Sequence, residues 1–291
     1  MSQSRSEIVE QESRQGRIVV ATTLLGVAAT LIGNIIQSSG VSVESDDDAE
    51  RLVDRADSFS TILAGSIIGG LGFILLGVTL LFLFSAAQRR SDAMVGTLKP
   101  LLIIGPVMLA ISGVATSFAY DSVASDFVSM GATTGEEGVN RAEDLISGSG
   151  LLQFAAFTGL AGLAAFAFGV VYTALHAMRT GLLTRFWGTL GMAFGAAFLL
   201  SQFFGPIGFF GVSLWMLHAV LQSRGRWPGG ALPAWQTGTA VPWPDPKAPP
   251  PEPEREEAAQ PEDFEGSATE LDPERPGRRD NKRKRKRKQR G

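Results

Sequence analysis

Residues 58–88 read SFSTILAGSIIGGLGFILLGVTLLFLFSAAQ and contain no charged side chain. A bilayer hydrocarbon core of about 30 Å is crossed by roughly 20 apolar residues of α-helix, and an uncharged run of about 18 residues or more is the usual signal. The run is apolar on all sides and does not alternate, so it predicts a helix and not a barrel strand. This stretch therefore indicates an integral membrane protein.

Four further uncharged runs lie between Arg17 and Glu44, Lys99 and Asp121, Asp144 and Arg179, and Arg185 and Arg224. The last run, residues 186–223, would form one helix of about 57 Å, which is nearly twice the hydrocarbon thickness. The sequence Gly-Pro-Ile-Gly at 205–208 provides a turn near its middle, because proline lacks an amide donor and glycine tolerates turn conformations. We therefore predict an all-α polytopic bundle of six spans, at about 18–37, 62–87, 100–120, 151–177, 186–204 and 207–223.

The distribution of lysine and arginine predicts which side each loop faces. An N-terminus inside the cell places ten basic residues on cytoplasmic flanks and three, Arg51, Arg55 and Arg141, on the opposite side. This bias predicts a cytoplasmic N-terminal segment (1–17), a transmembrane domain (18–223) and a cytoplasmic tail (224–291). The ten are Arg5, Arg14, Arg17, Arg89, Arg90, Lys99, Arg179, Arg185, Arg224 and Arg226.

The first span has an alternative interpretation as a cleaved signal peptide, since the small residues Ser38, Ser39 and Gly40 follow it. Its apolar length of about 20 residues exceeds the usual 7–15 of a signal sequence and favours an uncleaved anchor. Helical spacing of apolar residues also predicts short helices in two outer loops, around 49–56 and 139–146, with Ser45 as a cap for the first. They are either connectors resting on the span ends or a partner surface.

Small residues four positions apart occur at Gly65 and Gly69, at Gly191 and Gly195, and at Ala165 and Gly169. Such spacing lets helix backbones approach closely, which matters in lipid because hydrophobic burial no longer drives helix association. The partner is either another span of the same chain or a second copy in a homo-oligomer.

The residue inventory gives little support for catalysis or metal binding. The chain has no cysteine and two histidines, His176 and His218, which excludes thiolate chemistry and histidine-rich metal centres. The predicted spans hold no charged residue of the kind that transporters and proton relays use, and their polar candidates are Asn34, Gln37, Gln153 and Gln202. We therefore expect no enzyme activity, cofactor or metal site.

Two further ligand hypotheses come from the same inventory. His176 and His218 both fall near cytoplasmic span ends, so they are a candidate pair, but without nearby acids such a pair is a poor metal site. The acidic run at 46–50 offers oxygen ligands for calcium, but it lacks the spacing of an EF-hand loop.

The predicted tail is proline-rich, then acidic, and ends in a polybasic run, so its composition predicts disorder. Basic runs attract anionic lipid headgroups or nucleic-acid phosphates, and the tail is long enough to return to its own bilayer. We predict anionic-lipid binding, with nucleic acid or a merely solvated tail as alternatives. The candidate lipid-binding residues are Arg278, Arg279, Lys282, Arg283, Lys284, Arg285, Lys286, Arg287, Lys288 and Arg290.

Two segments, MRTGLLTRFWGTLGMAFG at 178–195 and PAWQTGTAVPWP at 233–244, resemble uncharacterised multi-pass bacterial membrane proteins. The resemblance implies a location in the bacterial inner membrane and no known activity. Together with the residue inventory, it favours a non-enzymatic assembly or interaction component. The rival is a transporter or channel for an uncharged or apolar solute, which a wide, water-accessible cavity between spans would favour.

Overall fold

The computed structural model describes residues 4–40, 48–91, 93–131, 135–201 and 207–243. Within these ranges the chain folds into helices joined by turns, and the predicted all-α class is confirmed. The elements are α1 (Arg5–Ser39), α2 (Asp48–Gln88), η1 (Gly96–Leu98), α3 (Leu101–Ser129), α4 (Glu136–Gly148), α5 (Gly150–Arg179), α6 (Arg185–Leu199), α8 (Ile207–Ser223) and α9 (Pro233–Thr237).

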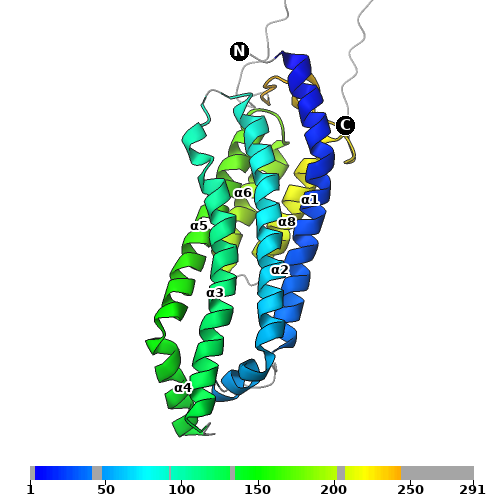
Figure 1. Cartoon of the computed structure of the whole chain (residues 1–291). Helices are drawn as coiled ribbons and strands as arrows, with labels where there is room; N and C mark the ends of the chain where they lie inside the picture. The colour runs from blue at the N-terminus through cyan, green and yellow to red at the C-terminus, as the bar shows by residue number, and fades with distance from the viewer. Residues whose placement is uncertain (1–3, 41–47, 92, 132–134, 202–206, 244–291) are drawn as a thin grey trace, which may run out of the picture. The chain divides into compact units, whose positions relative to one another are not determined.

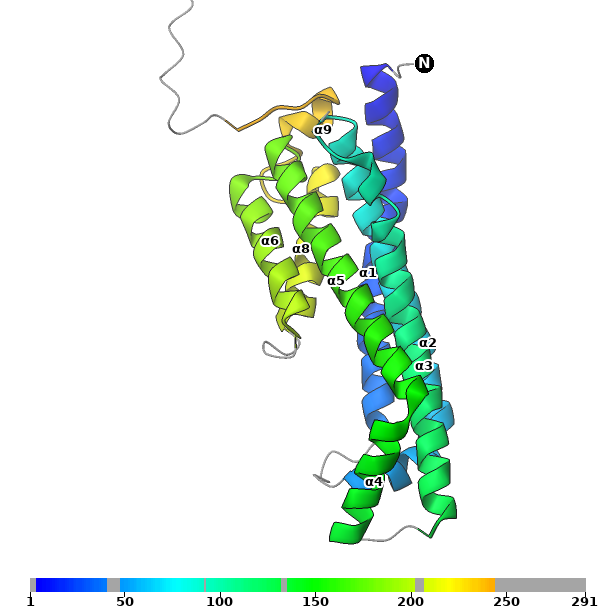
Figure 2. The same cartoon turned by 90° about the vertical axis from the view of Figure 1, so that its left-hand side faces the viewer.

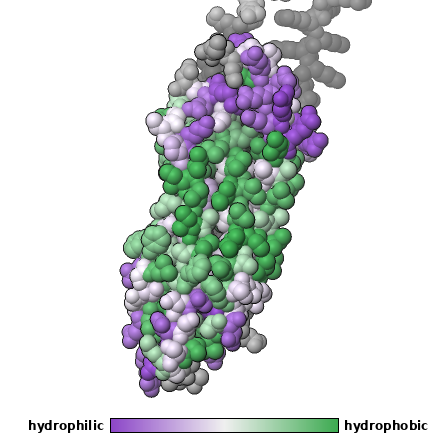
Figure 3. Space-filling view, in the orientation of Figure 1, coloured by the Kyte–Doolittle hydropathy of each residue, from purple (hydrophilic) through white to green (hydrophobic). Residues whose placement is uncertain are grey.

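Four of the described helices are long and apolar enough to cross a membrane: α1, α2, α3 with the preceding turn η1, and α5. They run up and down beside one another (Figure 1). Apolar side chains cover the middle of the visible face, and polar side chains gather at its two ends (Figure 3). This distribution is what a bilayer imposes, since charged groups are costly in hydrocarbon.

The prediction of six full spans is wrong, because the predicted fifth and sixth spans are short helices. Helix α6 has 15 residues and α8 has 17, which correspond to about 22 and 26 Å at 1.5 Å per residue. A hydrocarbon core of about 30 Å calls for roughly 20 residues. Charge-free length alone did not distinguish two full crossings from a shorter hairpin.

The α6 and α8 helices reach only part of the way along the long helices (Figure 2). Phe198 near the end of α6 and Phe209 near the start of α8 both contact Phe73 of α2, with ring centroids 6.3 and 6.1 Å apart. Phe73 lies 16 residues after Asp57 and 16 before Arg89, at the centre of the uncharged stretch of α2. The α6–α8 pair therefore ends at about half the depth of the apolar layer.

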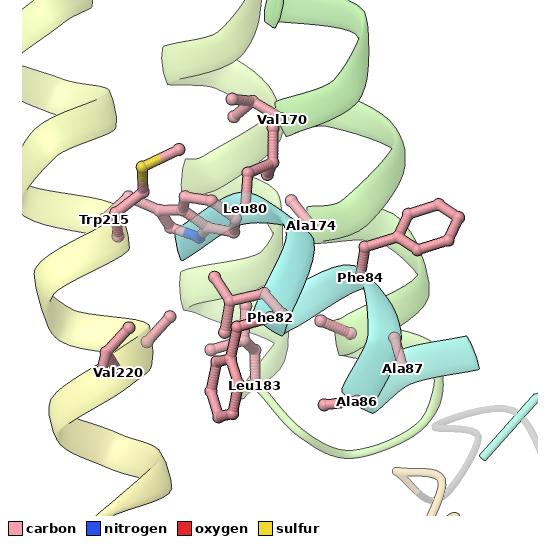
Figure 4. Close-up of a cluster of buried hydrophobic side chains, with 14 of the residues drawn as sticks. Leu80, Phe82, Phe84, Ala86, Ala87, Val170, Ala174, Leu183, Trp215 and Val220 are labelled. Carbon is pink, nitrogen blue, oxygen red and sulfur yellow. The ribbon is translucent and has the colours of Figure 1, made fainter. Parts of the chain in front are cut away.

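The main core lies where this pair packs against α2 and α5. Leu80 and Phe84 of α2, Val170 and Ala174 of α5 and Trp215 of α8 are all fully buried there (Figure 4). Phe166 also contacts Phe198 with ring centroids 5.5 Å apart. Large side chains thus fill the space between the described helices in this half of the bundle.

Close packing at small residues was predicted, and the neighbours lie in the same chain. A Cβ atom added to Gly33 of α1 would lie 2.5 Å from the backbone nitrogen of Gly69 and 2.6 Å from the carbonyl oxygen of Gly65. Gly191 lies against Trp215, and Gly195 against Val171. The glycines therefore set the spacing between helices α1 and α2 and around α6.

The opposite end of the bundle has a smaller core made by the first turns of α2, the last turns of α3 and helix α4. Leu52, Phe127 and Ala142 are buried in it. This confirms the predicted helices in the two outer loops, with the first one continuous with α2. Ser45, the predicted cap, lies outside the described residues.

Candidate functional site at the basic end of the bundle

We call the end of the bundle that carries Arg89, Arg90, Lys99, Arg179 and Arg185 the basic end. Helix α1 begins there, and α9 lies at the same end (Figures 1 and 2). The amide side chain of Gln222 donates a 2.6 Å hydrogen bond to the carbonyl of Gly230, which fixes the turn after α8. The two ends of the described chain therefore meet on one side of the apolar layer.

Glu12 of α1 is the buried acid at this end, with 5% of its surface exposed. Its Oε1 atom accepts hydrogen bonds from Arg89 Nη2 at 2.8 Å and Arg90 Nη1 at 2.7 Å. Its Oε2 atom accepts one from Arg90 Nη2 at 2.6 Å. One carboxylate thus holds two guanidinium groups, and the trio, here called the Glu12 cluster, keeps a net charge of +1.

Arg90 connects three elements through one side chain. Besides Glu12 of α1, its Nη1 atom donates to the carbonyl of Ala86 in its own helix at 2.8 Å. Its Nε atom donates to the carbonyl of Ala234 in α9 at 3.1 Å. The side chain is fully buried, so these charge-assisted bonds replace the water that the cation would otherwise keep.

Trp235 of α9 packs over the guanidinium group of Arg90. Its ring lies 5.3 Å from the Arg90 guanidinium carbon and stacks on Phe82, with centroids 6.0 Å apart and planes 9° apart. Its indole nitrogen donates to the carbonyl of Leu182 at 2.9 Å. Cation–π contact and aromatic stacking both stabilise such an arrangement.

Residues 233–243, here called the docked segment, pair with the loop between α5 and α6. Trp243 donates its indole hydrogen to the carbonyl of Leu183 at 2.9 Å, and the Val241 amide donates to the carbonyl of Thr180 at 3.1 Å. Gly181 has φ of +77° and lies against the Val241 carbonyl, so a side chain there would be strained and would collide. The two segments that carry the sequence resemblance therefore pack against each other.

The sequence placed residues 224–243 in the tail, whereas the structure places them on the bundle. Proline content was the reason for that assignment, but proline is compatible with ordered turns and with the first position of a helix, which Pro233 occupies in α9. The buried tryptophan supplies the apolar contact that a solvated tail lacks. Residues 244–291 lie outside the described residues.

The two histidines are buried side chains with different neighbours. His218 of α8 stacks on Trp187 with centroids 3.7 Å apart and meets Trp227 edge-on at 4.6 Å. His176 of α5 packs on Tyr172 at 4.5 Å. In the part of the chain that the structure describes, no group of three or more histidine, aspartate or glutamate residues is placed to hold a metal ion.

The other sequence candidates divide between local roles and undescribed positions. Asn34 donates to the carbonyl of Thr30 within α1, and Gln153 donates to the carbonyl of Ser147. Asp48, from the acidic run, lies 3.6 Å from Arg51 in the first turn of α2. Asp46, Asp47, Gln202 and the ten predicted lipid-binding residues from Arg278 to Arg290 lie outside the described residues.

Sequence reasoning missed Glu12, although a signal was present. The buried positions of α1 are 12, 16, 19, 23, 26, 30 and 33, which alternate in steps of four and three. This is the seam of a helix packed along a partner, and apart from Glu12 it is made of small or β-branched residues. A glutamate on such a seam predicts a buried partner of opposite charge, which Arg89 and Arg90 provide.

At the basic end, the buried cation of Arg90 therefore connects helices α1, α2 and α9. No family model matches this sequence, and no curated protein or solved structure matches it either. The chain is an α-helical membrane protein by its fold, and its role has to be argued from the basic end itself.

Proposed function

We propose that this protein is a non-enzymatic interaction component of a bacterial inner membrane. In this proposal both termini face the cytoplasm, and the polybasic tail binds anionic lipid on that face. The observation that carries the proposal is the docked segment, because it fixes the origin of the tail at the basic end. The positive-inside bias of the loops supports the same orientation.

The distance from the docked segment to the polybasic run supports binding to the same membrane face. Residues 244–277 separate Trp243 from Arg278. A flexible chain of that length has a root-mean-square span of about 30 Å, and proline extends it. Each lysine or arginine near an anionic surface contributes about 1 kcal/mol, so ten of them form a strong, salt-sensitive attachment.

The packed core favours this role over transport of an apolar solute. A carrier requires a cavity between its spans, whereas Phe166, Phe198 and Trp215 occupy the interior beside α2 and α5. An apolar hollow at the middle of the bundle, lined by residues that include Ile67, Leu71 and Ile111, lies on its surface between α2 and α3. This arrangement supports a closed bundle as the membrane anchor.

Co-flotation with vesicles tests the tail proposal. The full chain, held in neutral-lipid nanodiscs, is mixed with phosphatidylcholine vesicles with or without phosphatidylglycerol. We expect flotation with the anionic vesicles at low salt, and its loss at high salt, after deletion of 278–291, or when the ten basic residues are replaced by glutamine.

Equal flotation of the full chain and the glutamine variant would contradict lipid binding by the tail. A homopolymeric RNA that the tail binds in preference to the anionic vesicles would assign it to nucleic acid instead. The glutamine variant keeps the length of the tail, so it separates charge from simple tethering.

A further inference from the structure

A groove with polar and apolar portions lies between α1 and α2 at the basic end. It has a volume of about 470 Å³. Its polar part includes Gln11, Gln15, Ser85, Arg89 and Lys99, and its apolar part is formed by Ile18, Val19, Val78, Leu81 and Phe82.

The order of these residues along the two antiparallel helices separates the polar from the apolar part. In α1 the lining passes from Gln11 and Gln15 to Ile18, which is 65% exposed. In α2 it passes from Arg89 and Ser85 to Val78, which lies about two helical turns nearer the centre of the apolar layer than Ser85 does. Along both helices the polar lining residues therefore lie toward the membrane surface and the apolar ones toward the membrane centre. A phospholipid headgroup and its acyl chain require this order.

Among the residues that the structure describes, the groove and its surroundings carry more positive than negative charge. Arg89 uses Nε and Nη2 on Glu12 Oε1, while Arg90 also binds Glu12, so a single acid serves two cations. Lys99, at the end of η1, is exposed and adds a further positive charge to the rim. Counting Glu12, Arg89, Arg90 and Lys99 gives a net charge of +2.

The nearest acids on α1 are engaged elsewhere. Glu10 forms an ion pair with Arg14 at 3.3 Å, and Glu7 accepts a hydrogen bond from the backbone of Ser4 at 2.9 Å as part of the helix cap. Both line a neighbouring hollow and do not line the groove itself. Within the described part of the chain, the charged residues that line the groove are therefore Arg89 and Lys99.

We propose that this groove is a binding site for a single anionic phospholipid. Arg89 and Lys99 hold the phosphate, Gln11, Gln15 and Ser85 offer hydrogen bonds to the headgroup, and an acyl chain lies along Ile18, Val78 and Leu81. A free phosphate would neutralise Arg89 and Lys99 but would leave the apolar part of the groove without a ligand. The site does not depend on the polybasic tail.

Photo-crosslinking of the full chain in nanodiscs tests the site. The probes are phosphatidylglycerol and phosphatidylcholine, each carrying the same photoreactive group in its acyl chain, and crosslinked peptides are mapped by mass spectrometry. The apolar hollow between α2 and α3 is the internal control, since Ile67, Leu71 and Ile111 are similarly exposed but lie in a hollow without cations.

We expect phosphatidylglycerol to label Ile18, Val78 or Leu81 several times more than phosphatidylcholine, and both to label the control hollow equally. Lys99→Gln should lower the phosphatidylglycerol signal at the groove about fivefold, since one surface cation is removed, and Lys99→Arg should restore it. Arg89→Gln should act in the same direction, with its thermal stability in neutral lipid measured alongside. The proposal would be overturned if the ratio of phosphatidylglycerol to phosphatidylcholine labelling were the same at the groove and at the control hollow. It would also be overturned if Lys99→Gln had no effect on labelling at the groove.

Two further experiments distinguish this site from other causes of labelling at the groove. Competition by excess inorganic phosphate at constant ionic strength would assign the cations to a free anion and overturn the lipid site. Replacing the ten tail cations by glutamine should leave groove labelling unchanged, even if vesicle flotation by the tail fails. Loss of groove labelling in that variant would show that the tail supplies the selectivity and would overturn the site.

Discussion

At the scale of single residues, Glu12 is a buried carboxylate that pairs with two arginines. Arg90 is fully buried, and its charge is balanced by a carboxylate that is itself 4% exposed. Removing one partner of a buried ion pair costs about 3–5 kcal/mol, because the remaining charge has neither water nor a counterion. Exposed pairs contribute far less, since water and salt screen them.

Glu12→Gln should therefore destabilise the protein strongly. The amide keeps the shape and one acceptor oxygen, but it leaves two guanidinium groups side by side without a counter-charge. We expect a loss of about 3 kcal/mol in the free energy of unfolding, measured by denaturant titration in mixed micelles.

Glu10→Gln is the matched control, because the Glu10–Arg14 pair is exposed, with 76% and 80% of the two side chains accessible. It should change stability little. Equal effects of the two substitutions would mean that burial of Glu12 has no energetic consequence.

At the scale of elements, the α1–α2 pair depends on the absence of side chains at a few positions. The Cβ of an alanine at Gly33 would meet backbone atoms of α2, which cannot move without separating the helices. Thr23 and Thr79 also share a 2.8 Å hydrogen bond across this interface. Shape and polar contact together replace the hydrophobic driving force that is missing in lipid.

Gly33→Ala should therefore destabilise the bundle by about 1–3 kcal/mol through overpacking. Gly113→Ala in α3 should act in the opposite direction, because nothing lies within 4 Å of its added Cβ and alanine has the higher helix propensity, by about 1 kcal/mol. Unfolding free energies of both variants in the same micelles provide the measurement. A stabilising Gly33→Ala would contradict the close approach of α1 and α2.

At the scale of the whole described bundle, the depth of the α6–α8 pair distinguishes four full crossings from six. The chain has no native cysteine, so single cysteines can be introduced without background. Leu200→Cys lies just after α6 and two residues beyond Phe198, at the level of Phe73 and Phe166.

A membrane-impermeant maleimide should not label Leu200→Cys from either side, whereas it should label Ser13→Cys from one side and Ser129→Cys from the other. Ser13 and Ser129 are both exposed, near the start of α1 and at the end of α3. Labelling of Leu200→Cys together with Ser129→Cys would restore the six-span topology. The orientation predicted from basic residues is read from the same experiment.

Much of this architecture was predictable because charged side chains are costly inside the hydrocarbon layer. The uncharged runs identified α1, α2, α3 and α5, and the apolar spacing in the outer loops identified α4. The depth of the α6–α8 pair was not predictable, since Gly205 and Pro206 indicate a turn without giving the length of the helices beside it. The contacts of Trp235 were hidden for another reason: they join residues that lie more than fifty positions apart in the chain.

The position of Arg90 links the two ends of the described chain. Its guanidinium group binds Glu12 from the first described helix and Ala234 from the last one, so the two share this contact. Proteolytic removal of the first dozen residues would leave the cation beneath Trp235 without its acid and would loosen the C-terminal attachment from a distance. Proteolytic cleavage near the N-terminus would thus weaken the attachment of the docked segment on the same side of the membrane.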